Sequence, residues 1–171
     1  MIIIDKIIYI IDIINEKISR WVSFLVFALI LTLSYEVFSR YVLGKPTQWS
    51  FDLTYFLSSL FLMLSMAYTW KCCEHVGVDL ISSRLPKRVT AFLNIVFIIF
   101  LFFLAWGNIS RVMYTDVLRS WALKEKATIG FMPRIYPYKT WIFTGVIMMV
   151  LQGVSQIIKE FIILFRGGEQ L

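Results

Sequence analysis

The sequence predicts an all-α integral membrane protein with four transmembrane helices and an N-terminal interfacial amphipathic helix. The first observation behind this fold class is composition. Of the 171 residues, 59% are hydrophobic and 17% are aromatic, and the mean hydropathy of +0.76 is well above that of a soluble domain. The second observation is length, because each of four apolar runs has about the 20 residues that cross a hydrocarbon core roughly 30 Å thick. Only Glu36 is charged within these runs, which cover residues 21–39, 53–70, 89–110 and 140–158.

The four runs define a single membrane domain, residues 1–171, without an extramembrane domain of its own. The helical pattern of the third run continues beyond its apolar part and can reach residue 126. A helix of that length would measure roughly 55 Å, so it must project from the bilayer, tilt strongly or break. With the flanking residues that continue each helix, the spans are expected at about 21–42, 51–71, 87–112 and 137–165.

A polar stripe follows the isoleucine-rich segment before the first span. Asp5, Asp12 and Ser19 are seven residues apart, and Tyr9 and Glu16 lie between them. This pattern is typical of a helix that lies in the membrane interface, the expected position of residues 1–20. An aqueous extension of the first span fits the same pattern equally well. No small-residue cleavage site follows the first apolar run, which favours a retained anchor over a secretory signal.

The first connector begins where the first span ends. Glu36 and Arg40 are four residues apart, so they can pair on one helix face, with the acid on the favoured N-terminal side. Arg40 also complements the negative end of the helix dipole. Gly44 and Pro46 then predict that the helix stops.

The same connector also opens the second span. Trp49 lies where an aromatic belt residue is expected at the level of the lipid headgroups. Ser50 is a plausible N-cap, and Asp52 then falls in the positive first turn of the next helix. The connector therefore closes one helix, marks the membrane surface and opens the next helix.

Prolines and glycines also mark helix boundaries in the other two connectors. Pro86 is expected at the first position of the third span. Gly130, Pro133 and Pro137 interrupt regular helix, and Pro137 is expected to start the fourth span. Four spans place both termini on one side of the membrane. Of the 17 lysines and arginines, nine fall on the side of the termini, which leaves eight for the other side, so charge does not orient the chain.

The net charge of +6 does not indicate a nucleic-acid partner. The cations fall in the connectors, where anionic lipid headgroups are the simpler partner. The adjacent Cys72 and Cys73 form neither a CxxC redox motif nor a disulfide framework, so we assign them no function.

The search for chemistry finds no catalytic or cofactor site. Glu36 is the one ionisable candidate within the apolar runs, and a structural ion pair with Arg40 is favoured over a transport carboxylate. His75 stands near Cys72, Glu74 and Asp79, but a single histidine cannot make a bis-histidine haem, and no zinc-binding spacing is present. His75 is therefore interpreted as a connector residue that hydrogen-bonds or touches a partner. We expect no catalysis, no metal and no cofactor in this chain.

Three ordered motifs resemble a known family. The stretches "RYVLGKPTQWSFDL", "KCCEHVGVDLISSRLPKR" and "ATIGFMPRIYPY", each leading into a span, are similar to the small membrane subunit (Q subunit, DctQ-like) of tripartite ATP-independent periplasmic (TRAP) transporters. The resemblance covers nearly the whole chain after the N-terminal helix. The positions that match the family pattern are Arg40, Gly44, Pro46, Trp49, His75, Val76, Asp79, Leu85 and Pro86. Asp52 also fits the pattern, because the family often has an acidic residue at that position.

The resemblance implies a non-catalytic subunit of a transporter in the bacterial inner membrane, with both termini in the cytoplasm. Its partners would be a large multi-span permease subunit, which carries the substrate and sodium, and a periplasmic substrate-binding protein. The solute would be an organic acid such as a sialic acid or a C4-dicarboxylate. This chain would scaffold the large subunit and help dock the binding protein. On the implied orientation, the residues near the binding protein would be Arg40, Lys45, Trp49, Lys126 and Arg134.

Two other functions remain to be compared with this one. The first is a small autonomous membrane carrier that uses Glu36 as its coupling carboxylate. The second is a membrane-redox or assembly enzyme, which the absence of a catalytic pattern disfavours. The apolar centres of the spans suit a scaffold better than an independent coupled transporter, which would need a charged or broken-helix site near the bilayer midplane.

Overall fold

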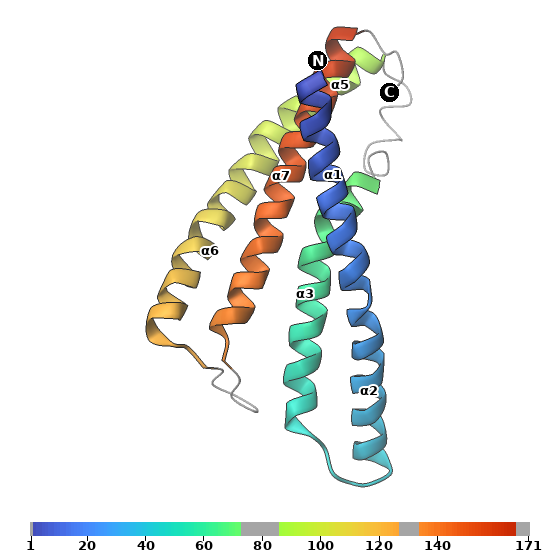
Figure 1. Cartoon of the computed structure of the whole chain (residues 1–171), viewed down its shortest axis with the longest axis vertical. Coiled ribbons are helices and arrows are strands. Elements are labelled where there is room, and N and C mark those ends of the chain that lie inside the picture. The colour runs from blue at the N-terminus through green and yellow to red at the C-terminus, as the bar shows by residue number, and fades with distance from the viewer. Residues whose placement is uncertain (1, 73–85, 127–133, 167–171) are drawn as a thin grey trace.

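The computed structural model describes residues 2–72, 86–126 and 134–166, and helices account for nearly all of them. These residues contain no strand, and the isolated bridge between Lys126 and Arg134 is the one β-type pairing among them. Figure 1 shows the helices as two hairpins that open away from each other toward one end of the molecule. The helices are α1 (Ile2–Ser23), α2 (Leu25–Tyr41), α3 (Gln48–Cys72), α5 (Lys87–Phe97), the π-helix η1 (Ile98–Phe103), α6 (Leu104–Leu123) and α7 (Tyr136–Arg166).

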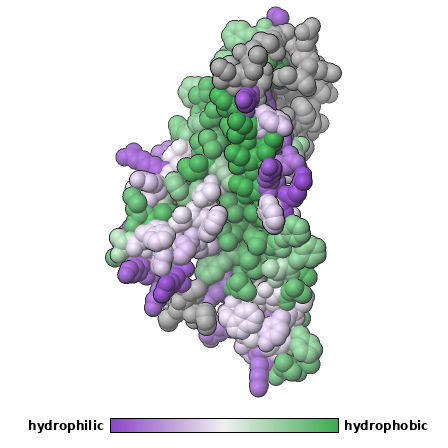
Figure 2. Space-filling model, viewed as in Figure 1, coloured by the Kyte–Doolittle hydropathy of each residue, from purple (hydrophilic) through white to green (hydrophobic). Residues whose placement is uncertain are grey.

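Four helical segments are long and apolar enough to cross a membrane, which confirms the predicted all-α membrane fold. Two of them have 36 residues, or about 54 Å of helix, which exceeds a bilayer core of roughly 30 Å. Figure 2 shows a broad apolar surface on the face in view, as expected for helices that contact lipid or another membrane protein. The four segments are Lys6–Tyr41, Gln48–Cys72, Arg88–Leu123 and Tyr136–Phe165.

The N-terminal helix continues directly into the first span. Only a local irregularity at Phe24 separates α1 from α2, and short backbone hydrogen bonds from Phe24 to Trp21 (3.2 Å) and from Phe27 to Phe24 (3.1 Å) bridge it. α1 is therefore helical and nearly continuous in sequence with α2, while its position relative to the membrane interface stays a prediction. α1 packs against α3 and α7, so Asp12 and Ser19 of the polar stripe face the bundle, while Tyr9 remains 66% exposed.

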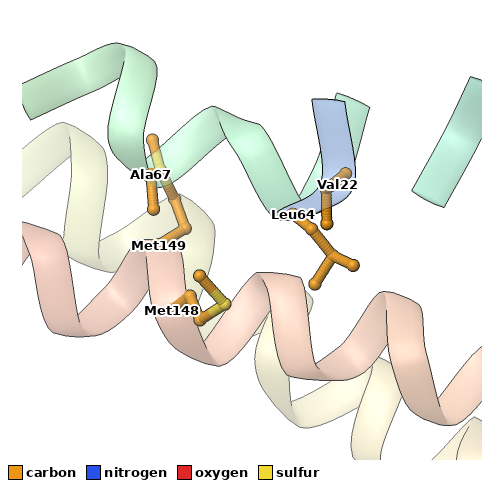
Figure 3. Close-up of a cluster of buried hydrophobic side chains, with 5 residues drawn as sticks. All are labelled: Val22, Leu64, Ala67, Met148 and Met149. Atoms are coloured by element: carbon orange, nitrogen blue, oxygen red, sulfur yellow. The ribbon is translucent and has the colours of Figure 1, made fainter. Parts of the chain in front are cut away.

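Helix α7 is the centre of the bundle. It contacts α1, α3, α5, η1 and α6, and 44% of its most apolar window is buried, against 11–17% for the other spans. Figure 3 shows buried side chains of α1, α3 and α7 pointing toward one another in the main apolar cluster. This cluster consists of Val22, Leu64, Ala67, Met148 and Met149.

Glycines bring α7 close to its neighbours. A Cβ atom on Gly145 would lie 2.9 Å from the carbonyl oxygen of Met63 in α3. A Cβ atom on Gly153 would lie 2.3 Å from the ring of Phe102, which belongs to the π-helix. Phe102 also packs against Trp70 of α3 in a tilted arrangement, with ring centroids 4.5 Å apart. The π-helix therefore turns an aromatic side chain into the contact between α3 and α7.

Three expectations about the connectors were wrong, because α3 and α5 begin at other residues than predicted. α3 begins at Gln48, so Ser50 is not its N-cap but a buried first-turn residue whose hydroxyl donates to the Thr32 carbonyl (3.3 Å). For the same reason Asp52 lies beyond the first turn. Pro86 is the N-cap of α5 rather than its first helical residue. The sequence placed these caps from residue type alone, whereas α3, packed against α2, starts three residues earlier than expected.

Candidate functional site

Glu36 organises the corner between α2 and α3. One of its carboxylate oxygens accepts from Arg40 Nη2 (2.7 Å) and Nε (3.1 Å). The other accepts from the backbone N–H of Thr47 (3.1 Å) and from the Thr47 hydroxyl. The side chain is only 12% exposed. Glu36 thus ties the end of α2 to the residue before α3, which is a structural use of its charge.

The chain reverses direction at Gly44. Its φ of +62° lies in the left-handed region, which favours glycine. The Ser39 hydroxyl donates to the Lys45 carbonyl (2.6 Å), and the Lys45 N–H donates to the Ser39 carbonyl (3.0 Å). Gly44 therefore ends the first span as the sequence predicted.

Trp49 lies at the same corner. Its ring packs on Tyr35 with centroids 5.5 Å apart, and 41% of the residue is exposed. An indole that is packed on one side and open on the other suits the headgroup level of a membrane. Asp52 follows one turn later in α3 and also has an interaction partner.

A second polar corner joins α6 to α7. Lys139 of α7 forms ion pairs with Asp116 of α6 (2.9 Å) and with Glu125 of the connector (2.8 Å). Glu125 also accepts from the Ser120 hydroxyl, and its own carbonyl accepts from the Ile135 N–H (3.1 Å). One lysine thereby holds together the end of α6, the connector and the start of α7.

The charged candidates Lys126 and Arg134 are neighbours at this second corner. They pair across the antiparallel bridge that follows Glu125. Trp121 donates its indole N–H to the Thr140 hydroxyl (2.9 Å) and packs on Tyr136 with centroids 4.6 Å apart. The second corner thus has its own exposed indole at the end of a span, as Trp49 provides at the first corner.

The ammonium of Lys139 holds the pKa of the Glu125 carboxyl below its ordinary value of 4.5, and the hydrogen bond from Ser120 acts in the same direction. A lowered pKa stabilises the fold fully above the ordinary value, and this stabilisation is lost as the pH falls through the lowered one. We expect Glu125→Gln to lower the melting temperature by about 1–3 °C at pH 7. This difference should shrink below pH 4.5. Thermal unfolding of the purified chain at pH 7 and pH 3.5, followed by tryptophan fluorescence, measures both values, and an equal difference at the two pH values would contradict the assignment.

The structure brings the predicted residues together in two groups. Glu36, Arg40, Trp49 and Asp52 lie at the first corner, and Lys126 and Arg134 lie at the second. Both corners are at the same end of the bundle, opposite the first residues of α1 and the last turn of α7 (Figure 1). The candidates His75 and Asp79, with Val76, Leu85 and Cys73, lie outside the described residues. Cys72, the last residue of α3, is exposed.

A buried polar cluster between α1 and α7 was not predicted. Asn15 donates to Gln152 (2.6 Å), and Gln152 donates to Asp12 (3.2 Å). Lys159 forms an ion pair with the other oxygen of Asp12 (3.2 Å). Gln152 is 1% exposed and Asn15 is 2% exposed, so these amides are part of the bundle interior.

The same face of α7 continues toward α5. Glu160, which is 8% exposed, accepts from Asn94 of α5 (2.9 Å). Ser155 is fully buried, and its hydroxyl is without a hydrogen-bond partner in the described part of the chain. The recurrence of Gln152, Gln156, Lys159 and Glu160 at helical spacing could have revealed this face. The mean hydropathy of this segment does not reveal the polar face, because each polar residue has apolar neighbours in the sequence.

These groups do not form a recognisable metal or catalytic centre. No set of three or more metal-ligating side chains gathers within residues 2–72, 86–126 and 134–166. The carboxylates of Asp12, Glu36, Asp116, Glu125 and Glu160 are engaged by lysine, arginine, serine, threonine or amide groups. The arrangement is suited to fastening helices to one another.

Comparison with protein families identifies the chain. Residues 29–162 match the family described as tripartite ATP-independent periplasmic transporters, DctQ component. The matched range runs from within α2 to the last turns of α7 and includes both polar corners. Comparisons with curated proteins and with solved structures found no match. The family match confirms the resemblance inferred from the three motifs, and the chain belongs to the DctQ family of TRAP transporter components.

Proposed function

We propose that the chain is the non-catalytic small permease subunit of a sodium-coupled, binding-protein-dependent transporter for organic acids. It scaffolds a large multi-span subunit, in which substrate and sodium bind, and it helps to dock a periplasmic substrate-binding protein. The family match over residues 29–162 is the observation that carries this proposal, because that family is one of transporter components rather than of enzymes. The solute class would be a sialic acid or a C4-dicarboxylate.

The engagement of Glu36 supports a scaffold over an autonomous carrier. A coupling carboxylate must exchange a proton or cation during transport. Glu36 instead has both oxygens bound, one by Arg40 and one by Thr47, at the end of a helix. Its bonds would have to break in every cycle, and the α2–α3 corner would then open.

The proposed orientation places this corner and the α6–α7 corner in the periplasm. The chain would then lie in the bacterial inner membrane with both termini in the cytoplasm. The exposed cations Arg40, Lys45, Lys126 and Arg134 would face the binding protein. This proposal accounts for the two polar corners that lie at one end of the bundle.

Reconstitution tests the function directly. Proteoliposomes with this chain alone should take up no sialic acid or C4-dicarboxylate, whereas liposomes that also hold the large subunit and the binding protein should take up one of them in a sodium gradient. Uptake by this chain alone would contradict the proposal.

A Glu36 variant separates the two transport hypotheses. Glu36→Gln in the complete system should keep at least half of the uptake rate and lower the thermal stability of the chain, because a neutral amide replaces the acceptor for Arg40. A coupling carboxylate would show the opposite pattern, with uptake abolished and assembly intact.

A further inference from the structure

Ser155 of α7 carries a buried hydroxyl that is not satisfied by the protein. The residue is fully buried, and no group in the described part of the chain bonds to its hydroxyl. It lies within the fourth apolar run, residues 140–158, where lipid offers no hydrogen-bonding group. A buried hydroxyl without a hydrogen bond is costly, so its presence requires a physical reason.

The usual partner of a helical serine does not bond to Ser155. Serine and threonine hydroxyls in helices can donate to the carbonyl four residues earlier. The hydroxyls of Thr32, Ser65 and Ser110 do so in this bundle, over distances of 2.6–2.8 Å. The Ser155 hydroxyl makes no such bond with the carbonyl of Leu151. It is therefore available to a group outside its own helix.

The side of α7 that carries Ser155 is the side that contacts α1. Gln152, Ser155 and Lys159 are spaced by three and four residues, so they share one side of the helix. Gln152 bonds to Asn15 (2.6 Å) and to Asp12 (3.2 Å). Lys159 pairs with Asp12 (3.2 Å). Ser155 thus lies between two residues of α7 that bind α1, beside the buried polar cluster.

The amides of that cluster have hydrogen-bonding capacity left. A primary amide has two N–H donors and an oxygen acceptor. Asn15 and Gln152 each use one N–H in the bonds described above, and the Asn15 oxygen accepts none of these bonds. Both residues are at most 2% exposed, so bulk solvent has little access to the unused groups. A small polar molecule could join them to the Ser155 hydroxyl.

Charge and size determine which molecule fits. A cation is disfavoured because the Lys159 ammonium already neutralises Asp12, whose two oxygens are both bound. An anion would be repelled by the Asp12 carboxylate, and a lipid headgroup cannot reach a fully buried side chain. Water is neutral, is the smallest molecule that both donates and accepts, and makes about three hydrogen bonds in protein interiors.

We propose that a water molecule is bound inside the bundle at the Ser155 hydroxyl and links it to the amides of Asn15 and Gln152. The water belongs to the contact between α1 and α7, and it completes the polar cluster that fastens the N-terminal helix. This inference concerns contacts within the chain, so it does not depend on the proposed function.

A density map of the full chain that resolves ordered solvent tests the site directly. The map should show a solvent peak within hydrogen-bond distance of Ser155 Oγ and of an amide of Asn15 or Gln152. A map that shows other ordered waters but no peak here, with Ser155 Oγ on the Leu151 carbonyl, would overturn the proposal.

Replacement of Ser155 by alanine provides the second readout, because it removes one partner of the water. Ser110→Ala is the matched control, since the Ser110 hydroxyl bonds to its own helix (2.7 Å) and both substitutions gain the same helix propensity. Thermal unfolding in detergent, followed by tryptophan fluorescence, should give Ser155→Ala a melting temperature about 2–4 °C below that of Ser110→Ala. An equal or higher melting temperature of Ser155→Ala would also overturn the proposal, because removal of an unsatisfied hydroxyl does not destabilise a protein.

Discussion

Replacing Gly145 by alanine should weaken the contact between α3 and α7 more than the same change at Gly107 or Gly153 does. The new Cβ would lie 2.9 Å from the Met63 carbonyl oxygen and 3.0 Å from its carbonyl carbon. These are backbone atoms inside a helix, so they cannot move without moving α3. Overpacking of this kind costs about 1–3 kcal/mol. Alanine is favoured over glycine in a helix by up to about 1 kcal/mol, so the net free energy of unfolding should fall by up to about 2 kcal/mol.

Two other glycines supply a matched series. At Gly107 nothing lies within 4 Å of the added Cβ, so Gly107→Ala in the isolated chain should be neutral or stabilising by up to about 1 kcal/mol. At Gly153 the obstacle is the ring of Phe102, a side chain that can rotate, so Gly153→Ala should fall between the other two. Denaturant unfolding in detergent, followed by tryptophan fluorescence, ranks the three variants. Equal stability of Gly145→Ala and Gly107→Ala would show that α3 and α7 are not held this closely.

The main features of the fold follow from the sequence because they depend on local patterns. Run length predicts helices that can span a bilayer, and the spacing of Glu36 and Arg40 predicts an i,i+4 ion pair, which the structure contains. Gly44 predicts the turn because few other residues adopt its backbone conformation readily. In each case the interacting groups lie within a few residues of one another.

The missed features depend on which helices become neighbours. The bond from Thr47 to Glu36 joins positions 11 residues apart, and the bond from Asn15 to Gln152 joins positions 137 residues apart. No local pattern contains such partners. The Ser50 cap failed for the same reason, since contact with α2 places its hydroxyl on Thr32. The roles of His75 and Asp79 stay predictions, because both residues lie outside the described part of the chain.

Breaking the ion pair between Lys159 and Asp12 should release α1 from the bundle. The two side chains are only 19% and 14% exposed, and Asp12 also accepts from Gln152. Removal of one partner from a buried ion pair leaves an uncompensated charge, which costs about 3–5 kcal/mol. Since this pair is partly exposed, we expect Lys159→Met to lower the free energy of unfolding by about 3 kcal/mol.

A double-mutant cycle isolates the pair from the other contacts that Lys159 makes. Asp12→Leu combined with Lys159→Met removes both charges, so the double variant should be more stable than Lys159→Met alone by about 1–2 kcal/mol. Hydrogen exchange of the amides in α1 should rise in the single variant and return toward the wild-type rate in the double variant. If the two substitutions are simply additive, the pair does not hold α1, and the uncharged contact between Asn15 and Gln152 must fasten the helix instead.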